Sequence, residues 1–193
     1  MELLAFLSYT WIMSITPGPN NLMALAESRR AGFRGAATFL WGLFVSFFIV
    51  NGIVYGSLQF LQEGMPWIEG PLKLIGSAYI AYLAYAMVRP AAGRAQKDSG
   101  KGRQFLAGMV LNMTNIKVII FMSIGYTSFI FPIYEEWWIR IGLGIVMCLA
   151  CTASNLIWAA AGAALDRFFT RYDKAVNRVL AALLLLSAAE IWL

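Results

Sequence analysis

The chain has 193 residues, of which 60% are hydrophobic and only 13% are charged. About a quarter of the residues of a soluble domain are charged, so the composition excludes an ordinary soluble protein. The sequence holds 0 His and 2 Cys, which excludes zinc sites with His ligands, Ser-His-Asp and Cys-His hydrolases, and disulfide scaffolds. The charged residues fall in short clusters between apolar stretches long enough to cross a bilayer. We therefore expect an integral membrane protein surrounded by lipid.

Six apolar runs follow one another along the chain, and each predicts a transmembrane helix. Hydrocarbon offers no partners to backbone N–H and C=O groups, so only helices and closed barrels span a membrane. Unbroken apolar runs without period-two alternation exclude the barrel. The expected helices cover residues 3–26, 36–60, 71–88, 105–130, 139–165 and 175–193, and the polar cytoplasmic loop 89–103 joins two halves. The chain is thus expected to form one all-α transmembrane domain, 1–193.

The basic residues predict how this domain is oriented. Clusters at 29–34, 89–103 and 167–178 hold 12 of the 15 Lys and Arg, whereas the other loops carry Glu. By the positive-inside rule the basic loops face the cytoplasm, and both termini then face outward. The net charge of +5 is therefore explained by topology, without a nucleic-acid partner. A cleaved signal peptide is the alternative for the first run, but its start carries Glu2 and no Lys or Arg.

The run Thr16-Pro17-Gly18-Pro19-Asn20-Asn21 interrupts the first expected helix. Both prolines lack an N–H donor and clash with the preceding turn, and the glycine between them removes stiffness. We expect the helix to open near mid-depth, which is tolerated only where protein or a wet cavity receives the freed backbone groups. Asn20 and Asn21 then begin the second half-helix, where an amide can cap the backbone or contact a ligand. A kink used only for packing is the alternative.

The run Asn112-Met113-Thr114-Asn115-Ile116-Lys117 interrupts the fourth expected helix. Lys117 lies near the bilayer centre, where a cation costs at least ~2.5–3.5 kcal/mol and normally faces a partner or water. Because no Asp or Glu lies at comparable depth in the six runs, its partner is expected to be an Asn, a carbonyl at a helix break, or an anion from a substrate. A purely structural Lys bonded to carbonyls is the alternative. Asn112 and Asn115 share a face with Lys117 only if the helix is irregular.

Helices 1 and 4 hold corresponding places in two halves of three helices. An odd number per half predicts an inverted repeat, as in many secondary transporters. Together the two interruptions predict a site for a small zwitterion. Its carboxylate would be met by Lys117 or by the positive end of a half-helix, and its ammonium by carbonyls at the opposite half-helix end.

The run from Thr16 to Asn21, followed by Gly32-Phe33-Arg34, resembles the signature of the lysine exporter (LysE) family of bacterial amino-acid exporters, RhtB group. The likeness covers the whole chain in length, hydrophobic runs and polar middle loop. Much of the family has Asn-Pro-Lys in the fourth helix, whereas this chain has Asn115-Ile116-Lys117. That departure, with the following Val118-Ile119-Ile120, resembles the cysteine/O-acetylserine exporter branch. So does Asn155-Leu156-Ile157-Trp158-Ala159.

The resemblance implies a secondary-active exporter in the bacterial inner (plasma) membrane, working by proton antiport. Cysteine and O-acetylserine are the favoured substrates, followed by homoserine, threonine or other neutral or basic amino acids. The sequence has no Walker-type motif for ATP. It also shows no membrane-embedded acid, so Lys117 and the end-of-helix carboxylates Glu27 and Asp166 are the candidates for moving the proton.

Weaker features leave alternatives open. Asn155, in the middle of the fifth expected helix, could line the same cavity or hydrogen-bond a neighbouring helix. Cys148 and Cys151 share one helical face and are expected to be packed thiols, because no further metal or redox ligands accompany them. Gly52 and Gly56 permit close helix packing within the bundle or between protomers, so the sequence leaves a homo-oligomer open.

Two other function classes are weighed against export. A membrane enzyme needs paired acids, His or metal ligands at depth, and the chain has none, so we expect no catalytic residues, no metal ion and no cofactor. A non-transporting scaffold predicts that no wet cavity lies at the two interrupted helices.

Overall fold

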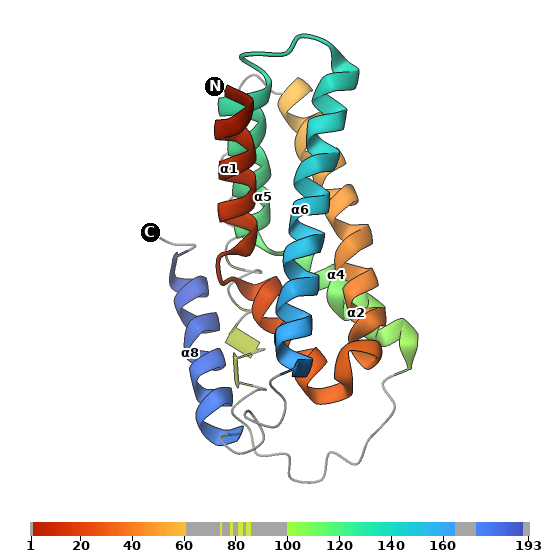
Figure 1. Cartoon of the computed structure of the whole chain (residues 1–193), viewed down its shortest axis with the longest axis vertical. Coiled ribbons are helices and arrows are strands. Elements are labelled where there is room, and N and C mark those ends of the chain that lie inside the picture. The colour runs from red at the N-terminus through yellow and green to blue at the C-terminus, as the bar shows by residue number, and fades with distance from the viewer. Residues whose placement is uncertain are drawn as a thin grey trace.

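The computed structural model describes residues 2–60, 100–164 and 173–190, with isolated residues 74, 78, 81, 82, 84 and 85. The elements in these ranges are all helical (Figure 1). They are α1 (Glu2–Ile15), α2 (Pro19–Phe60), α4 (Lys101–Met113), α5 (Ile116–Ile124), the π-helical turn η1 (Gly125–Ile130), α6 (Trp137–Ala164) and α8 (Asp173–Glu190). The third expected helix and most of the 89–103 loop lie outside the described ranges.

Both interruptions predicted from the sequence are confirmed. The helix ends at Ile15 and restarts at Pro19, so the break falls on the segment with two prolines. The second break falls at Thr114 and Asn115, where α4 and the following helical segment differ in direction by 53°. Thr114 Oγ1 donates to the carbonyls of Val110 at 2.8 Å and Leu111 at 3.3 Å, and Val110 also keeps its bond from the Thr114 N–H. The Asn115 side chain caps α5 by accepting from the Lys117 N–H. Side-chain bonds to the backbone therefore supplement helical ones and partly replace them at a break that contains no proline.

Some expected boundaries were wrong. The first two expected helices are separated by a turn within the basic segment 29–34, as predicted, but helical structure extends closer to that turn than expected, and α2 includes both sides of it. Helix α2 is interrupted only at Gly32, whose φ of 73° and ψ of 165° suit a residue without a Cβ. Here the chain turns back, so the two parts of α2 run in opposite directions (Figure 1). Helix α4 begins at Lys101, inside the expected loop, because Lys101 and Arg103 are exposed and extend the helix past the apolar run.

Two helices in the described ranges are long and apolar enough to cross a membrane, Pro19–Gln59 and Trp137–Ala164. A third span exists if the bent pair 101–113 and 116–130 counts as one. Helix α1 has 14 residues and would rise only about 21 Å. It is therefore too short to cross about 30 Å of hydrocarbon without the part of α2 that follows the break.

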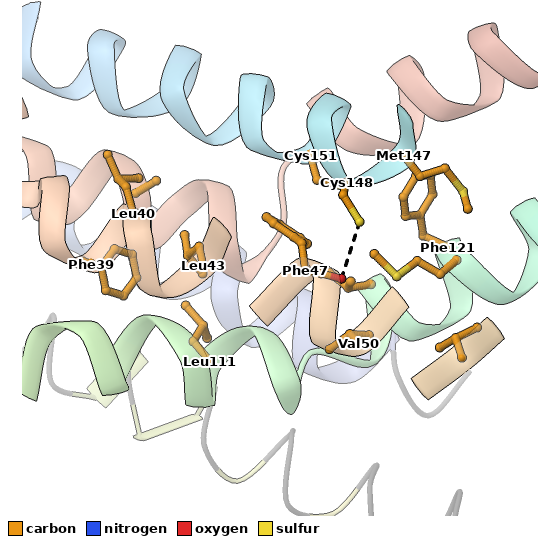
Figure 2. Close-up of a cluster of buried hydrophobic side chains, with 14 of the residues drawn as sticks. Phe39, Leu40, Leu43, Phe47, Val50, Leu111, Phe121, Met147, Cys148 and Cys151 are labelled. Carbon is orange, nitrogen blue, oxygen red and sulfur yellow. Dashed lines mark hydrogen bonds between the residues drawn. The ribbon is translucent and has the colours of Figure 1, made fainter. Parts of the chain in front are cut away.

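A continuous apolar core holds α2, α4, α5 and α6 together (Figure 2). The central side chains are Phe39, Leu40, Leu43, Phe47 and Val50 of α2, Leu111 of α4, Phe121 of α5, and Met147, Cys148 and Cys151 of α6. The Cys148 thiol donates to the carbonyl of Phe47 at 3.5 Å, as the dashed line shows. Both thiols are free and buried. Cys148 packs in the core, whereas the Cys151 Sγ atom also lies 3.4 Å from Ser14 Oγ.

Glycines allow α2 and α4 to approach backbone to backbone. A Cβ at Gly108 would collide with the carbonyl of Phe39, and one at Gly42 would collide with the carbonyl of Phe105. By contrast, nothing in the described part of the chain lies within 4 Å of a Cβ placed at Gly52 or Gly56. The close contact inside the bundle thus involves glycines other than the pair singled out in the sequence.

We predict that Gly108→Ala destabilises the protein by about 1–3 kcal/mol, because the added methyl group must push two helix backbones apart. The matched control is Gly102→Ala on the same helix, where a Cβ meets open space and the higher helix propensity of Ala is favourable. The measurement is the melting temperature of each purified variant in detergent. Equal melting temperatures for the two variants would contradict the close α2–α4 contact.

Candidate functional site

The end of α1 is held by side chains from elsewhere in the chain. A helix leaves its last four carbonyls without helical partners, and in this chain the residues of the break range from buried to exposed. Five donor side chains, including Ser154 described below, satisfy five successive carbonyls. Thr16 Oγ1 donates to Met13 O (2.9 Å), Asn21 Nδ2 to Ser14 O (2.8 Å) and Thr16 O (3.0 Å), Trp158 Nε1 to Ile15 O (3.1 Å), and Lys117 Nζ to Thr16 O and Pro17 O (both 3.1 Å).

Lys117 reaches this end from α5. Besides the two carbonyls, its ammonium donates to Thr16 Oγ1 at 2.8 Å. Of the partners weighed from the sequence, carbonyls at a helix break are therefore the ones these bonds use. The side chain crosses the break directly over Gly18, where a Cβ would lie 3.0 Å from Lys117 Cδ and 3.1 Å from Nζ. Gly18 thus leaves the space that the lysine fills.

A chain of buried amides links the two breaks. Asn115 Nδ2 donates to Asn20 Oδ1 at 2.9 Å, Asn20 Nδ2 donates to Asn112 Oδ1 at 2.7 Å, and Asn112 Nδ2 donates to Ser46 Oγ at 2.9 Å. Asn115 Oδ1 in turn accepts the backbone N–H of Lys117 at 3.1 Å. Each amide therefore donates and accepts in one direction along the chain, which satisfies groups that would otherwise be costly to bury.

The irregular helix explains how three polar side chains of the second break reach one place. Asn112 is fully buried and Asn115 nearly so, at 0% and 2% exposure. Both contact Asn20, while Lys117 reaches past it to Thr16. On a regular helix Lys117 would point elsewhere, but the 53° bend brings all three to the break in α1.

A cavity of about 30 Å³ lies between the two breaks and α6. Its lining is Met13, Ser14, Gly18, Asn20, Asn21, Phe47, Asn115, Lys117, Val118, Phe121, Cys151 and Asn155. Such a volume holds about one or two water molecules and is too small for an amino acid. In this conformation the cavity is small, and polar side chains of both breaks line it together with apolar ones.

The cavity brings together most, but not all, of the residues predicted from the sequence. Six of them line it, namely Gly18, Asn20, Asn21, Asn115, Lys117 and Asn155. Thr16, Pro17 and Asn112 bind lining residues through hydrogen bonds, and Pro19 is buried as the first residue of α2. Glu27 instead pairs with Arg30 on its own helix at 2.7 Å, and Asp166 lies outside the described residues.

Asn155 has an unused donor. Its side chain is 4% exposed and lines the cavity. Its Nδ2 atom has no hydrogen-bond partner among the described residues. A buried amide N–H group without an acceptor costs free energy. The Asn155 Nδ2 group is therefore suited to donate to a bound molecule that carries an acceptor.

Several residues of the site were missed by sequence reasoning. Ser154 Oγ donates to Ser14 O at 2.7 Å, Trp158 binds Ile15, and Ser46 ends the amide chain. Their only signal is a small polar group or an indole N–H inside an apolar run, which is common in packed transmembrane helices. The sequence alone does not say which of these groups meets a helix end.

The helix ends give the cavity two electrostatic sides. The carboxyl end of α1 carries partial negative charge, and the amino ends of α2 and α5 carry partial positive charge. Asn20 stands in the first turn of α2 and Asn115 caps α5, so donors gather on the positive side. The arrangement suits a small molecule with one positive and one negative group.

Comparisons with known proteins find relatives that match the chain over nearly its whole length. The cysteine/O-acetylserine efflux protein of Salmonella typhimurium (strain LT2) is 34% identical over 193 residues, 100% of this chain and 98% of the relative. The protein of the same name from Escherichia coli (strain K12) is 32% identical over 191 residues, 97% of this chain and 96% of the relative. No solved structure matches. The family model described as LysE type translocator matches residues 11–193, and the chain therefore belongs to the LysE type translocator family of multi-pass membrane transporters.

Proposed function

We propose that this chain is a secondary-active exporter of small amino acids and their derivatives, with cysteine and O-acetylserine as favoured substrates. The family is one of amino-acid efflux translocators, so the chain is not an enzyme. The substrate proposal is supported by the names of the two relatives. The observation that carries it is the small cavity between two broken helices, whose lining includes Lys117 and Asn155, the latter with an Nδ2 group that has no partner among the described residues.

In the proposed site the two charged groups of a zwitterion meet opposite sides of the cavity. The ammonium is received by the carbonyl oxygens at the end of α1, which carries partial negative charge. The carboxylate is received by Lys117 and by the Nδ2 group of Asn155, which has no acceptor among the described residues. Ligands bound at discontinuous helices in this way are typical of secondary transporters.

We also propose six membrane spans, arranged as an inverted repeat of three and three, in the bacterial inner membrane. The basic segment 29–34 and the start of α4 both lie in the lower half of Figure 1, whereas the N-terminus and the connection from η1 to α6 lie at the top. This separation supports the positive-inside orientation with both termini outside. We also propose that the chain forms a homo-oligomer. Gly52 and Gly56 offer a surface for it, because no described residue lies within 4 Å of a Cβ placed at either glycine.

Proton antiport is the proposed way of driving export. The candidates for carrying the proton are Lys117, Glu27 and Asp166. Lys117 lines the cavity itself. Glu27 pairs with Arg30 and does not line the cavity, so Lys117 is better placed to link substrate binding to proton movement. Export of homoserine, threonine or other neutral or basic amino acids is the alternative with the same machinery. A non-transporting scaffold is the alternative of another class.

Export by cells that overproduce the chain tests the proposal. Cells are grown on toxic levels of cysteine, O-acetylserine, homoserine or threonine, and the extracellular product is identified. We predict that the wild type exports cysteine and O-acetylserine, and that Lys117→Met lowers the initial rate at least tenfold. The control Lys101→Met removes an exposed cation at the start of α4 and should retain export. Absence of export of all four compounds by the wild type would favour the scaffold.

Asn155 is tested separately by its effect on apparent affinity. Loss of a hydrogen bond to a charged group costs about 1.5–3 kcal/mol, so Asn155→Leu should raise the half-saturating substrate concentration about tenfold or more. The control is Thr152→Val one turn earlier on α6, where the hydroxyl bonds only its own helix at Cys148 O. If Asn155→Leu and Thr152→Val export with the same half-saturation, Asn155 does not contact the substrate.

A further inference from the structure

Lys117 places a primary ammonium group in a ready-made cation site. Its oxygen partners include Thr16 O, Thr16 Oγ1 and Pro17 O, at 3.1, 2.8 and 3.1 Å. An ammonium has three donors and no acceptor, and each of these oxygens is an acceptor for it. They also stand at the negative end of α1, which favours a positive charge over a neutral donor.

An amino-acid substrate carries the same chemical group. Its ammonium, like that of the lysine side chain, is bound to a tetrahedral carbon and offers three donors. Oxygens that suit the one therefore suit the other. The substrate's ammonium and the ε-ammonium of Lys117 cannot occupy the same three oxygens together, because two like charges at that distance repel strongly in a low dielectric.

We propose that Lys117 is a tethered competitor, which fills the substrate's ammonium site while the transporter is empty and leaves it when substrate binds. This inference rests on the proposed function, because it assigns the ammonium end of the export substrate to these oxygens. On leaving, the lysine comes to lie beside the carboxylate of the incoming zwitterion, so one side chain both vacates the cation site and neutralises the anion.

The small volume of the cavity follows from this arrangement. The aliphatic part of Lys117 lies over Gly18 and lines the cavity, so its position keeps the volume at about 30 Å³. Withdrawal of the side chain frees space at the same point where it frees the oxygens. Substrate entry and cavity opening are then one event.

The exchange also meets a constraint of the membrane. A backbone carbonyl without a donor within the hydrocarbon region costs several kcal/mol, and Pro17 is exposed at the break. A lysine that returns to the Pro17 carbonyl each time substrate leaves keeps the broken helix satisfied in the empty state, as the observed bond does.

The alternative is that Lys117 is a permanent structural staple between α1 and α5. Binding of amine-only and carboxylate-only probes to the purified full-length protein separates the two accounts. Cysteamine has the ammonium and thiol of cysteine without its carboxylate, and 3-mercaptopropionate has the carboxylate and thiol without the ammonium. Both are measured by calorimetry on the wild type, on Lys117→Met and Lys117→Gln, and on the control Lys101→Met.

A tethered competitor predicts that cysteamine binds at least tenfold more tightly to Lys117→Met and Lys117→Gln than to the wild type or Lys101→Met. Binding of 3-mercaptopropionate should weaken in the same two variants, because the anion loses its cation. Lys117→Gln keeps an amide donor for the carbonyls, so it can be tested even if Lys117→Met does not fold. Equal or weaker cysteamine binding in a folded Lys117 variant would overturn the inference. Since this readout is binding and not export, failure of export by the wild type would refute the proposed function separately.

Discussion

The carbonyl groups left open at the end of α1 are the constraint on which the rest of this structure depends. Two prolines and a glycine stop the helix inside an apolar segment, and each carbonyl left there must find a donor or cost several kcal/mol. Water cannot serve as a general solvent at that depth. The donors come from α2, α5 and α6 as Asn21, Lys117 and Trp158. These three helices are therefore fixed around one point.

The second break brings side chains to the first break that satisfy the polar groups left open there. Asn115 caps the start of α5 and also binds Asn20, and this pair connects the amino end of one half-helix to that of the other. The bend at Thr114 then aims Lys117 at the carbonyl end of α1. A small cavity with amide and ammonium groups in its lining results beside the apolar core of Figure 2. The amides of Asn20, Asn112 and Asn115 satisfy one another, whereas Asn155 Nδ2 has no partner among the described residues, and neither do Thr10 Oγ1 and Ser28 Oγ.

Sequence reasoning located both breaks because their causes are local. Proline and glycine act on the backbone of their own segment, and a lysine at bilayer depth requires a partner wherever it lies. It could not choose among the possible partners of Lys117, because that choice depends on how α5 approaches α1 in space. For the same reason Ser46 and Trp158 gave no signal, since neither is unusual in its own helix. The turn within residues 29–34 was predicted, but not how close the two helices come to it, because the single residue Gly32 makes the turn.

The central claim is tested by observing which ammonium group, that of Lys117 or that of the substrate, contacts the Pro17 carbonyl. The wild-type chain in lipid is labelled with ¹³C at the proline carbonyls and ¹⁵N at the lysine Nζ atoms, and solid-state NMR measures the dipolar coupling between them. The empty protein should show one coupling that is lost in Lys117→Gln. In a second sample, with unlabelled lysines and saturating ¹⁵N-labelled substrate, a coupling to the substrate nitrogen should appear. In a third sample, with ¹⁵N-labelled lysines and saturating unlabelled substrate, the Lys117 coupling should be lost. Persistence of the Lys117 coupling in the substrate-bound protein would contradict the account.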